Sequence, residues 1–589
     1  MDVVNNTFEI KEDFYLNGSK IKIISGAIHY FRVVPEYWRD RLEKLKAMGC
    51  NTVETYVPWN MHEYSKGCFN FDNNLDIEKF IKIAQELKLW VIIRPSPYIC
   101  AEWEFGGLPA FLLAEDGMKV RSSYAPFLKH LNEYYKELFK RISPLQVNNG
   151  GPIIMMQIEN EYGYYGNNKR YLQAINDMMR KFGAVVPFVT SDGPWGEALE
   201  SGKLDGEVLA TANFGSKPED ALKKLRSITC NRPLMCMEFW VGWFDAWGDK
   251  NHHARAVEDA AKDLDAILSE GHVNIYMFHG GTNFGFMNGA NDYEILTPDV
   301  TSYDYDAVLT ECGDLTPKYE AFKKVISKYM KIHEVTFSTT INKVSYGKIY
   351  TKEKVSLFNT LDSISTPQYS EDTLPMEKLG QSYGYILYRS NVGVGRNVES
   401  FRLIGAKDRA KVYVNGINVL TQYGGELGKS AELVLEKKED NYLDVLVENM
   451  GRANFGEKLN YQQKGIVDGV VIDKHAHAGW NHYTLPLDNT EKVNYNGGYK
   501  EGTPGFYKFE LQVEVLGDTF LRFDSWGKGC VFVNGFNIGR FWELGPQKSL
   551  YIPGPKLKVG KNEIVIFETE GKVAEYITLE NAPDLGVSE

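Results

Sequence analysis

The sequence predicts an α/β fold class: a (β/α)8 TIM barrel followed by two all-β, jelly-roll-like sandwich domains. Up to about residue 330, short apolar runs rich in β-branched residues alternate with longer stretches whose apolar residues recur every three or four positions. Beyond that point the helical spacing stops, and short strand-like runs separated by Asn-Gly and Gly-Gly turns take over. Repeated strand–helix alternation indicates a parallel sheet closed into a barrel.

Eight apolar runs are the candidate barrel strands. They span residues 21–30, 51–57, 90–98, 153–158, 186–191, 208–214, 234–238 and 273–278. Three of the intervening helices have clear end signals, because Gly49 can cap one, Asp76 can begin the next, and residues 257–268 form a stripe that stops before Gly271. The helical signal is weakest between residues 191 and 208, in the fifth and sixth units.

The second half of the chain contains an internal repeat. Residues 412–419 resemble residues 531–538, each segment with a central Asn-Gly, and each is followed by another strand, at 443–448 and 563–568. We therefore expect the barrel over residues 1–330, a connector over 331–379, and two related sandwiches over 380–490 and 491–589.

Composition excludes several classes of protein. The chain has 589 residues, 43% of them hydrophobic and 24% charged, which is ordinary for a globular protein and unlike a disordered, collagen-like or coiled-coil chain. Its net charge of −12 and its lack of Lys/Arg-rich runs argue against a nucleic-acid partner. Apolar runs stay below the 18 or so residues of a membrane span, so we expect no membrane partner.

The cysteines and the N-terminus favour a cytoplasmic location. The seven Cys are an odd number at scattered spacings without a CxxC pattern, which is typical of reduced thiols. Residues 1–6 lack the basic start and apolar stretch of an export signal. The many aromatic residues, 35 Tyr and 11 Trp among them, suit either a core or a sugar-binding site, and composition alone does not choose between these.

Candidate catalytic groups follow the fourth and seventh runs, where a barrel carries its active site. Glu159, Asn160 and Glu161 follow the fourth run, and Glu238 ends the seventh. If the fourth strand persists, Glu159 and Glu161 point the same way. Strands four and seven lie on opposite sides of the barrel, so their carboxyl groups can face each other. Two carboxyl groups about 5–5.5 Å apart suit a retaining glycosidase, whereas a single one is often a structural ion-pair partner.

At these positions the sequence resembles glycoside hydrolase family 35, the β-galactosidases. The segments that carry the resemblance are residues 55–60, 94–104, 157–163, 237–239, 280–284 and 301–307. They occur in order along nearly the whole barrel. The resemblance implies a compact bacterial type of enzyme that releases terminal β-linked galactose, with β-sandwiches after the barrel and a homodimeric assembly.

The resemblance also assigns roles to individual residues. It makes Glu161 the acid/base and Glu238 the nucleophile, and it assigns the 2-hydroxyl of the sugar to Asn160. The rest of the galactose pocket comprises Tyr56, Ala101, Glu102, Tyr276 and Tyr305. From its position alone, Glu102 could equally be a partner of Arg94. Double displacement through two carboxyl groups needs no metal or organic cofactor.

A second group of residues is expected to contact the leaving group. Trp240 and Trp243 follow Glu238 directly, and Phe455 lies in a sandwich loop that could reach back to the barrel. The resemblance favours galactose β-1,3-linked to an N-acetylhexosamine in a short oligosaccharide, while each Trp could instead pack in the core. Two alternatives stay open: an exo-β-glucosaminidase of the same fold, and a non-catalytic carbohydrate-binding protein.

Overall fold

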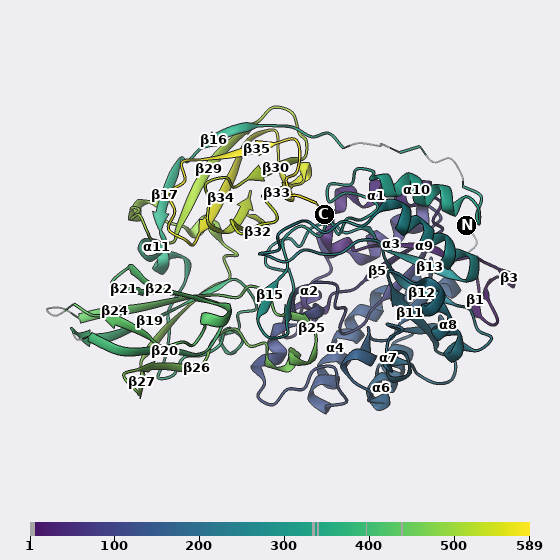
Figure 1. The fold of residues 1–589 in the computed structure, drawn as a ribbon, viewed down its shortest axis with the longest axis horizontal. Coiled ribbons are helices and arrows are strands. Elements are labelled where there is room, and N and C mark those ends of the chain that lie inside the picture. The colour runs from purple at the N-terminus through teal and green to yellow at the C-terminus, as the bar shows by residue number, and fades with distance from the viewer. Residues whose placement is uncertain (1–5, 333–335, 338–340, 396, 437–439, 589) are drawn as a thin grey trace.

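A closed barrel of eight parallel strands forms the first half of the chain in the computed structural model, which describes residues 6–332, 336–337, 341–395, 397–436 and 440–588 (Figure 1). Neighbouring strands follow the chain order, and each expected run overlaps one of them. The strands are β4 (Ile24–Ile28), β5 (Thr52–Tyr56), β8 (Trp90–Arg94), β9 (Ile153–Gln157), β10 (Phe188–Asp192), β11 (Leu209–Phe214), β12 (Met235–Trp240) and β13 (His272–His279). The predicted barrel is confirmed. Residues 1–5, on which the prediction about an export signal depends, lie outside the described part of the chain.

Helices cover the outside of the barrel, and their ends follow the sequence signals. Gly49 caps α1 in the left-handed conformation with φ +113°, and the Asp76 side chain accepts a hydrogen bond from the Lys79 backbone N–H at 2.9 Å at the start of α3. The weak signal after residue 191 corresponds to α7, a helix of only five residues. The covering helices are α1 (Trp38–Met48), α3 (Ile77–Glu86), α4 (Ala125–Ile142), α6 (Lys169–Lys181), α7 (Ala198–Gly202), α8 (Pro218–Thr229), α9 (Val257–Glu270) and α10 (Pro317–Ile326).

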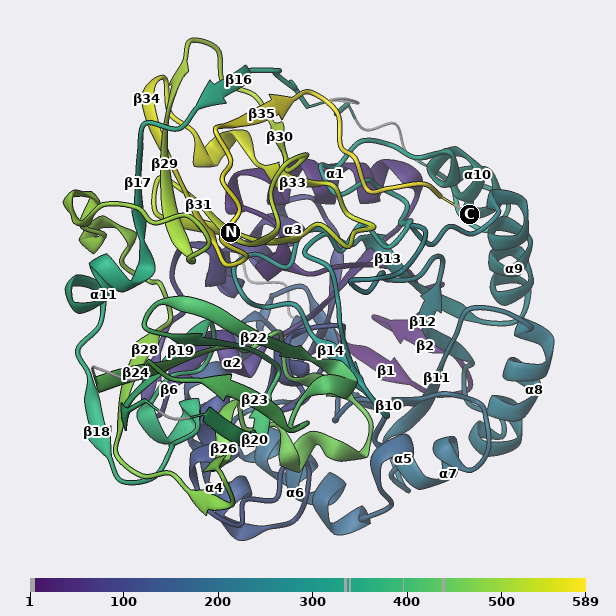
Figure 2. The same cartoon turned by 60° about the vertical axis from the view of Figure 1, so that its left-hand side comes forward.

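Two β-sandwiches lie one above the other against the barrel (Figure 2). The first pairs a six-stranded sheet, β18-β28-β19-β24-β21-β22, with the sheet β23-β20-β26-β27. Its strands are β18 (Gln368–Ser370), β19 (Tyr385–Val394), β20 (Asn397–Lys407), β21 (Arg409–Val414), β22 (Ile417–Tyr423), β23 (Ala431–Val434), β24 (Asp440–Glu448), β26 (Gly465–Ile472), β27 (His475–Ala476) and β28 (Trp480–Leu485). Apolar side chains from both sheets, such as Val445 and Phe401, share one core.

The second sandwich pairs β17-β29-β34-β31-β32 with β16-β35-β30-β33. Its strands are β16 (Gly347–Tyr350), β17 (Glu353–Ser356), β29 (Gly505–Val513), β30 (Thr519–Arg522), β31 (Lys528–Val533), β32 (Phe536–Trp542), β33 (Ser549–Ile552), β34 (Gly560–Glu568) and β35 (Tyr576–Glu580). Residues 331–379 thus contribute β16 and β17 to this sandwich and β18 to the first. The boundaries at residues 330, 379 and 490 stay predictions.

The internal repeat seen in the sequence is a repeat of topology. The hairpins β21–β22 and β31–β32 each turn through an Asn-Gly pair with positive φ, at Asn415 (+51°) and Asn534 (+50°). Each hairpin also has a register shift in the same place, after Val412 and after Val531. In both sandwiches a later strand, β24 or β34, pairs with the first strand of the hairpin.

A small sheet joins the first sandwich to the mouth of the barrel. The loop after β13 forms β14 (Ala290–Asp292) and β15 (Leu296–Pro298), and the sandwich strand β25 (Ala453–Phe455) pairs with β14. Just before β25, the fully buried Arg452 lies 2.5 Å from Glu104 of the barrel and also contacts Glu377 of the connector. One guanidinium thus compensates two buried carboxylates from different parts of the chain.

We expect Arg452→Ala to destabilise the fold by about 3 kcal/mol or more, because it leaves Glu104 and Glu377 buried without their cation. Urea unfolding followed by fluorescence measures the change. The control is Arg402→Ala on the exposed side of β20, which should shift stability by no more than about 0.5 kcal/mol. Equal unfolding midpoints for the two variants would show that the Arg452 contacts make no net contribution to the free energy of unfolding.

Candidate active site

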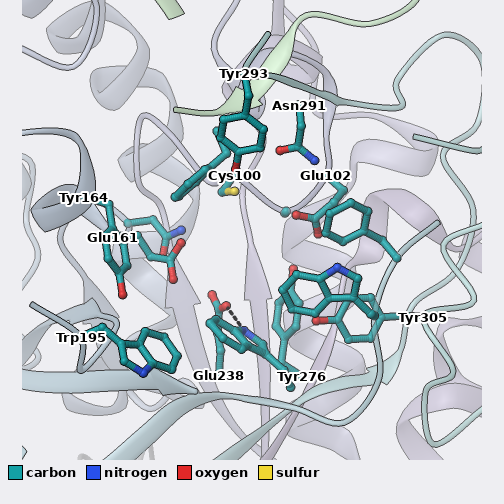
Figure 3. A pocket seen from close by; sticks show the side chains of 16 residues that line it. Cys100, Glu102, Glu161, Tyr164, Trp195, Glu238, Tyr276, Asn291, Tyr293 and Tyr305 are labelled. Atoms are coloured by element: carbon teal, nitrogen blue, oxygen red, sulfur yellow. Dashed lines mark hydrogen bonds between the residues drawn. The ribbon is translucent and has the colours of Figure 1, made fainter. Parts of the chain in front are cut away.

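A pocket opens at the carboxyl ends of the barrel strands and has a volume of about 430 Å³. Its walls contain ten of the eleven residues predicted for the site (Figure 3). They are Ala101, Glu102, Asn160, Glu161, Glu238, Trp240, Trp243, Tyr276, Tyr305 and Phe455. The eleventh, Tyr56, adjoins the pocket at the end of β5 and contacts Asn160 and Glu238. Glu102, Glu161 and Glu238 point into the same space (Figure 3).

Glu238 is held by one ion pair and two hydrogen bonds. Its Oε1 lies 2.7 Å from the Arg94 guanidinium and accepts a hydrogen bond from the Tyr56 hydroxyl at 2.5 Å. Its Oε2 accepts a hydrogen bond from the Trp240 indole at 3.0 Å, which is possible because residues two apart on β12 share a face. These contacts fix the orientation of the carboxylate and stabilise its negative charge.

Glu161 lies across the pocket in a different environment. It follows β9 in the left-handed conformation, with φ +45°, and its side chain is buried. Burial, followed by the nearby charge of Glu238, raises the pKa of Glu161 above the ordinary value of a glutamic acid. A hydrogen bond of 3.1 Å donated by the Asn213 amide to Oε1 acts in the opposite direction. The site therefore favours a protonated Glu161 beside a charge-stabilised Glu238.

Removal of the Asn213 amide should move the alkaline limb of the pH profile. Because this hydrogen bond lowers the pKa of Glu161, Asn213→Ala should raise it, and the protonated form should persist to higher pH. We expect the alkaline limb of kcat/KM to shift upward by about half a pH unit. A pH profile for the wild type and the variant measures this, and a shift to lower pH would contradict the assigned hydrogen bond.

The amide of Asn160 has a fixed orientation. Its Oδ1 accepts hydrogen bonds from Arg94 at 2.7 Å and from Gln157 at 3.1 Å. The Tyr56 hydroxyl oxygen lies 2.9 Å from Oδ1, but its proton is donated to Glu238 at the shorter distance of 2.5 Å. The Nδ2 group makes only a long contact of 3.4 Å with the Ile99 carbonyl. Asn160 can therefore offer a ligand an N–H donor but not a free acceptor.

Glu102 has a different partner from the one considered in the sequence. The interpretation that it pairs with Arg94 is wrong, because Arg94 faces Glu238 and Glu54. Glu102 instead accepts a hydrogen bond from the Tyr303 hydroxyl at 2.5 Å. Burial raises the pKa of Glu102 to about 7. Its backbone and those of Cys100 and Ala101 have positive φ angles, which turn the loop after β8 toward the pocket.

The expectation that Glu159 points the same way as Glu161 fails because strand β9 ends at Gln157. Glu159 also has a positive φ, and its carboxylate forms two hydrogen bonds of 2.8 Å with the buried Arg121. It does not line the pocket. Glu159 is thus a structural ion-pair partner, which was the alternative for a lone carboxylate.

Aromatic rings surround the mouth of the pocket. Trp240 stacks on Trp195 with ring centres 5.9 Å apart and meets Trp243 edge-on at 5.7 Å. Trp243 is 42% exposed, so the interpretation that it packs in the core is wrong. Phe455 reaches the pocket on β25, and its ring meets the ring of Tyr164 edge-on, with the ring centres 6.2 Å apart.

Sequence reasoning missed several lining residues. They are Cys100, Tyr164, Trp195, Phe244, Asn291 and Tyr293. Trp195 follows β10 in a Gly-Pro-Trp-Gly segment, so the rule that strand ends carry the site could have found it. Asn291 and Tyr293 arrive on the hairpin β14–β15, deep in a long loop whose path no local pattern predicts.

The fold and the pocket together define a class of protein. A parallel barrel that presents two buried carboxyl groups with different environments, next to exposed aromatic rings, is suited to acid/base chemistry on a carbohydrate. Comparison with known proteins agrees. Residues 13–329 match glycosyl hydrolases family 35, residues 373–486 match the first all-beta domain of beta-galactosidase, and residues 504–562 match its galactose-binding domain.

Relatives extend over most of the chain. Beta-galactosidase-1-like protein 2 of Homo sapiens is 39% identical and covers 98% of this chain and 91% of its own. Beta-galactosidase 1 of Dictyostelium discoideum is 38% identical, with 96% and 92% covered, and the beta-galactosidase of Xanthomonas manihotis is 38% identical, with 92% and 90% covered. The chain belongs to glycosyl hydrolase family 35 and is a glycoside hydrolase, as the sequence motifs predicted.

Proposed function

We propose that this protein is a retaining exo-β-galactosidase that releases terminal β-linked galactose from short oligosaccharides. The observation that carries the proposal is the pairing of Glu161, whose pKa is raised by burial and by Glu238, with Glu238, which Arg94 and Tyr56 orient. A pocket of about 430 Å³ suits the end of a sugar chain. Galactose as the released sugar is supported by the names of the relatives.

The reaction proceeds by two displacements at C1 of galactose. Glu238 attacks C1 while Glu161 transfers its proton to the leaving oxygen, which gives a galactosyl ester on Glu238. Burial and the charge of Glu238 both raise the pKa of Glu161, and esterification removes the second of these causes, so Glu161 then accepts a proton from water more readily. That water attacks C1 and releases galactose with its β configuration retained, and Glu238 becomes a carboxylate again.

Galactose hydroxyl groups would be held by the polar groups of the inner pocket. The free N–H of Asn160 is suited to donate to the 2-hydroxyl, because its carbonyl oxygen is already occupied. Glu102, Tyr276, Tyr305 and the loop at Ala101 would contact the remaining hydroxyls. Buried polar groups of this kind discriminate strongly, since a wrong sugar leaves them unpaired.

The aromatic rim would bind the leaving group, for which we propose an N-acetylhexosamine in β-1,3 linkage. Phe455→Ala should lower kcat/KM for galactosyl-β-1,3-N-acetylglucosamine by about tenfold, because the ring adds one wall to the leaving-group side. The same variant should change kcat/KM for p-nitrophenyl β-galactoside less than about threefold. Equal losses on the two substrates would remove Phe455 from the leaving-group site.

Hydrolysis of p-nitrophenyl glycosides tests the proposed function. Release of nitrophenol from the β-galactoside, at a kcat/KM well above that for the β-glucosaminide, is the expected result. The reverse preference would keep the barrel and the mechanism but make the enzyme an exo-β-glucosaminidase. Binding of galactosides without hydrolysis of either substrate would favour a carbohydrate-binding protein.

A cytoplasmic location and a homodimeric assembly are further parts of this proposal. The seven cysteines are all free thiols, and five of them are buried. Among the described residues, no helix is both long and apolar enough to cross a membrane. Light scattering of the purified protein tests the dimer, for which a mass of about twice 67.0 kDa is expected.

A further inference from the structure

A second carboxyl group faces Arg94 from inside the barrel. Glu54 lies on β5, two residues before Tyr56, and its side chain is fully buried. Its Oε1 lies 3.8 Å from the same guanidinium nitrogen of Arg94 that is 2.7 Å from Glu238. Two carboxyl groups thus share one cation, and Glu238 has the shorter contact.

The surroundings of Glu54 are costly for an ionisable group. Barrel interiors are usually filled by apolar side chains. Here Asn274 of β13 donates a hydrogen bond of 3.1 Å to Glu54 Oε2, while Oε1 accepts no hydrogen bond from any described residue. Since a buried carboxyl group without a structural need is expensive, a functional role is favoured.

We propose that Glu54 is a positioning residue that supplies the negative charge opposite Arg94 while Glu238 is esterified. The inference rests on the proposed function, because only a double displacement esterifies Glu238. Arg94 is fully buried and keeps its proton throughout the reaction. When Glu238 becomes a neutral ester, the cation loses its nearer carboxylate, and Glu54 is the carboxyl group that remains beside it.

The charges balance over the two steps. Burial, with a further contribution from the charge of Glu238, raises the pKa of Glu54 to about 7, whereas Arg94 acts to lower it. In the free enzyme a proton therefore resides on Glu54 in part of the molecules at neutral pH. As Glu238 loses its charge, that proton is released to bulk water, and it returns when hydrolysis regenerates the Glu238 carboxylate. His29 also lies near Arg94, but burial holds the pKa of His29 well below its usual value, so it stays neutral.

Glu54→Gln should therefore separate the two kinetic steps. With 2,4-dinitrophenyl β-galactoside, kcat/KM reports formation of the galactosyl ester, and kcat reports its hydrolysis. Glutamine cannot compensate Arg94, so the intermediate is destabilised relative to the states on either side of it. We expect kcat/KM to fall by about tenfold, the effect of one lost opposite charge on a buried group, while kcat does not fall.

Controls separate this role from a structural one. Glu63→Gln alters another buried glutamate, which accepts hydrogen bonds from Trp59 and Gly67 away from the pocket, and it should leave both parameters unchanged. Glu54→Asp keeps a charge near Arg94 and should recover most of the lost kcat/KM. If the Gln variant does not fold, Glu54→Asp carries the test, because its shorter side chain should still lower kcat/KM without lowering kcat.

Equal losses of kcat and kcat/KM in the variants would overturn the role, since they would report only loss of active protein. Unchanged parameters would overturn it as well. A wild type that does not hydrolyse the galactoside would instead refute the proposed function, so the two failures are distinct.

Discussion

Glu238→Gln should lower the rate of hydrolysis of p-nitrophenyl β-galactoside by about 10⁴-fold or more, because an amide cannot form the covalent ester. The residue's contacts explain the size of the effect. Arg94 and Tyr56 orient the Glu238 carboxylate, and in the variant a neutral amide occupies that position. Initial rates over a range of enzyme concentrations measure the loss.

The fold should survive this change, since glutamine has the same shape and Glu238 lies at the wall of an open pocket. An unchanged thermal unfolding midpoint, or one lowered only slightly, is the control. A variant that keeps more than a tenth of wild-type activity would exclude Glu238 as the nucleophile.

Glu161→Gln should have an effect that depends on the leaving group. An N-acetylhexosamine leaves only when its oxygen is protonated, so kcat/KM on the β-1,3-linked disaccharide should fall by about 10³-fold. Dinitrophenolate needs no proton to leave, so kcat/KM on 2,4-dinitrophenyl β-galactoside should fall less than tenfold. Stopped-flow or steady-state rates on the two substrates measure the difference, and equal losses on both would contradict the role of Glu161 as the acid.

The pH profile gives the second signature of Glu161. The group must be protonated to act as an acid, so wild-type kcat/KM on the disaccharide should fall as the pH rises through the raised pKa. In Glu161→Gln this alkaline limb should disappear, because glutamine does not titrate. A limb that persists unchanged would assign it to another group, such as Glu102, whose pKa is also raised by burial.

Most of the barrel could be predicted because parallel strands buried on both faces leave continuous apolar runs in the sequence. The motifs at strand ends led to Glu161 and Glu238, since the carboxyl ends of the strands meet at one face. The internal repeat was visible for a similar reason, because an Asn-Gly turn with positive φ admits few other residues.

The rest of the site depends on contacts between distant parts of the chain. The predicted orientation of Glu159 was wrong because β9 ends two residues before it. A strand end inside a polar segment has no sharp signal in the sequence. Tyr293 reaches the pocket on a hairpin that pairs with sandwich strand β25. Glu102 accepts a hydrogen bond from Tyr303, which lies 201 positions further along the chain. Such pairings follow from the folded topology, which single-sequence patterns do not determine.

Covalent labelling of the enzyme tests the central claim most directly. After incubation with 2,4-dinitrophenyl 2-deoxy-2-fluoro-β-galactoside, mass spectrometry should show one fluorogalactosyl group per chain, attached to the peptide that contains Glu238. Attachment to another carboxyl group, or continued turnover without any covalent adduct, would contradict a double displacement through Glu238.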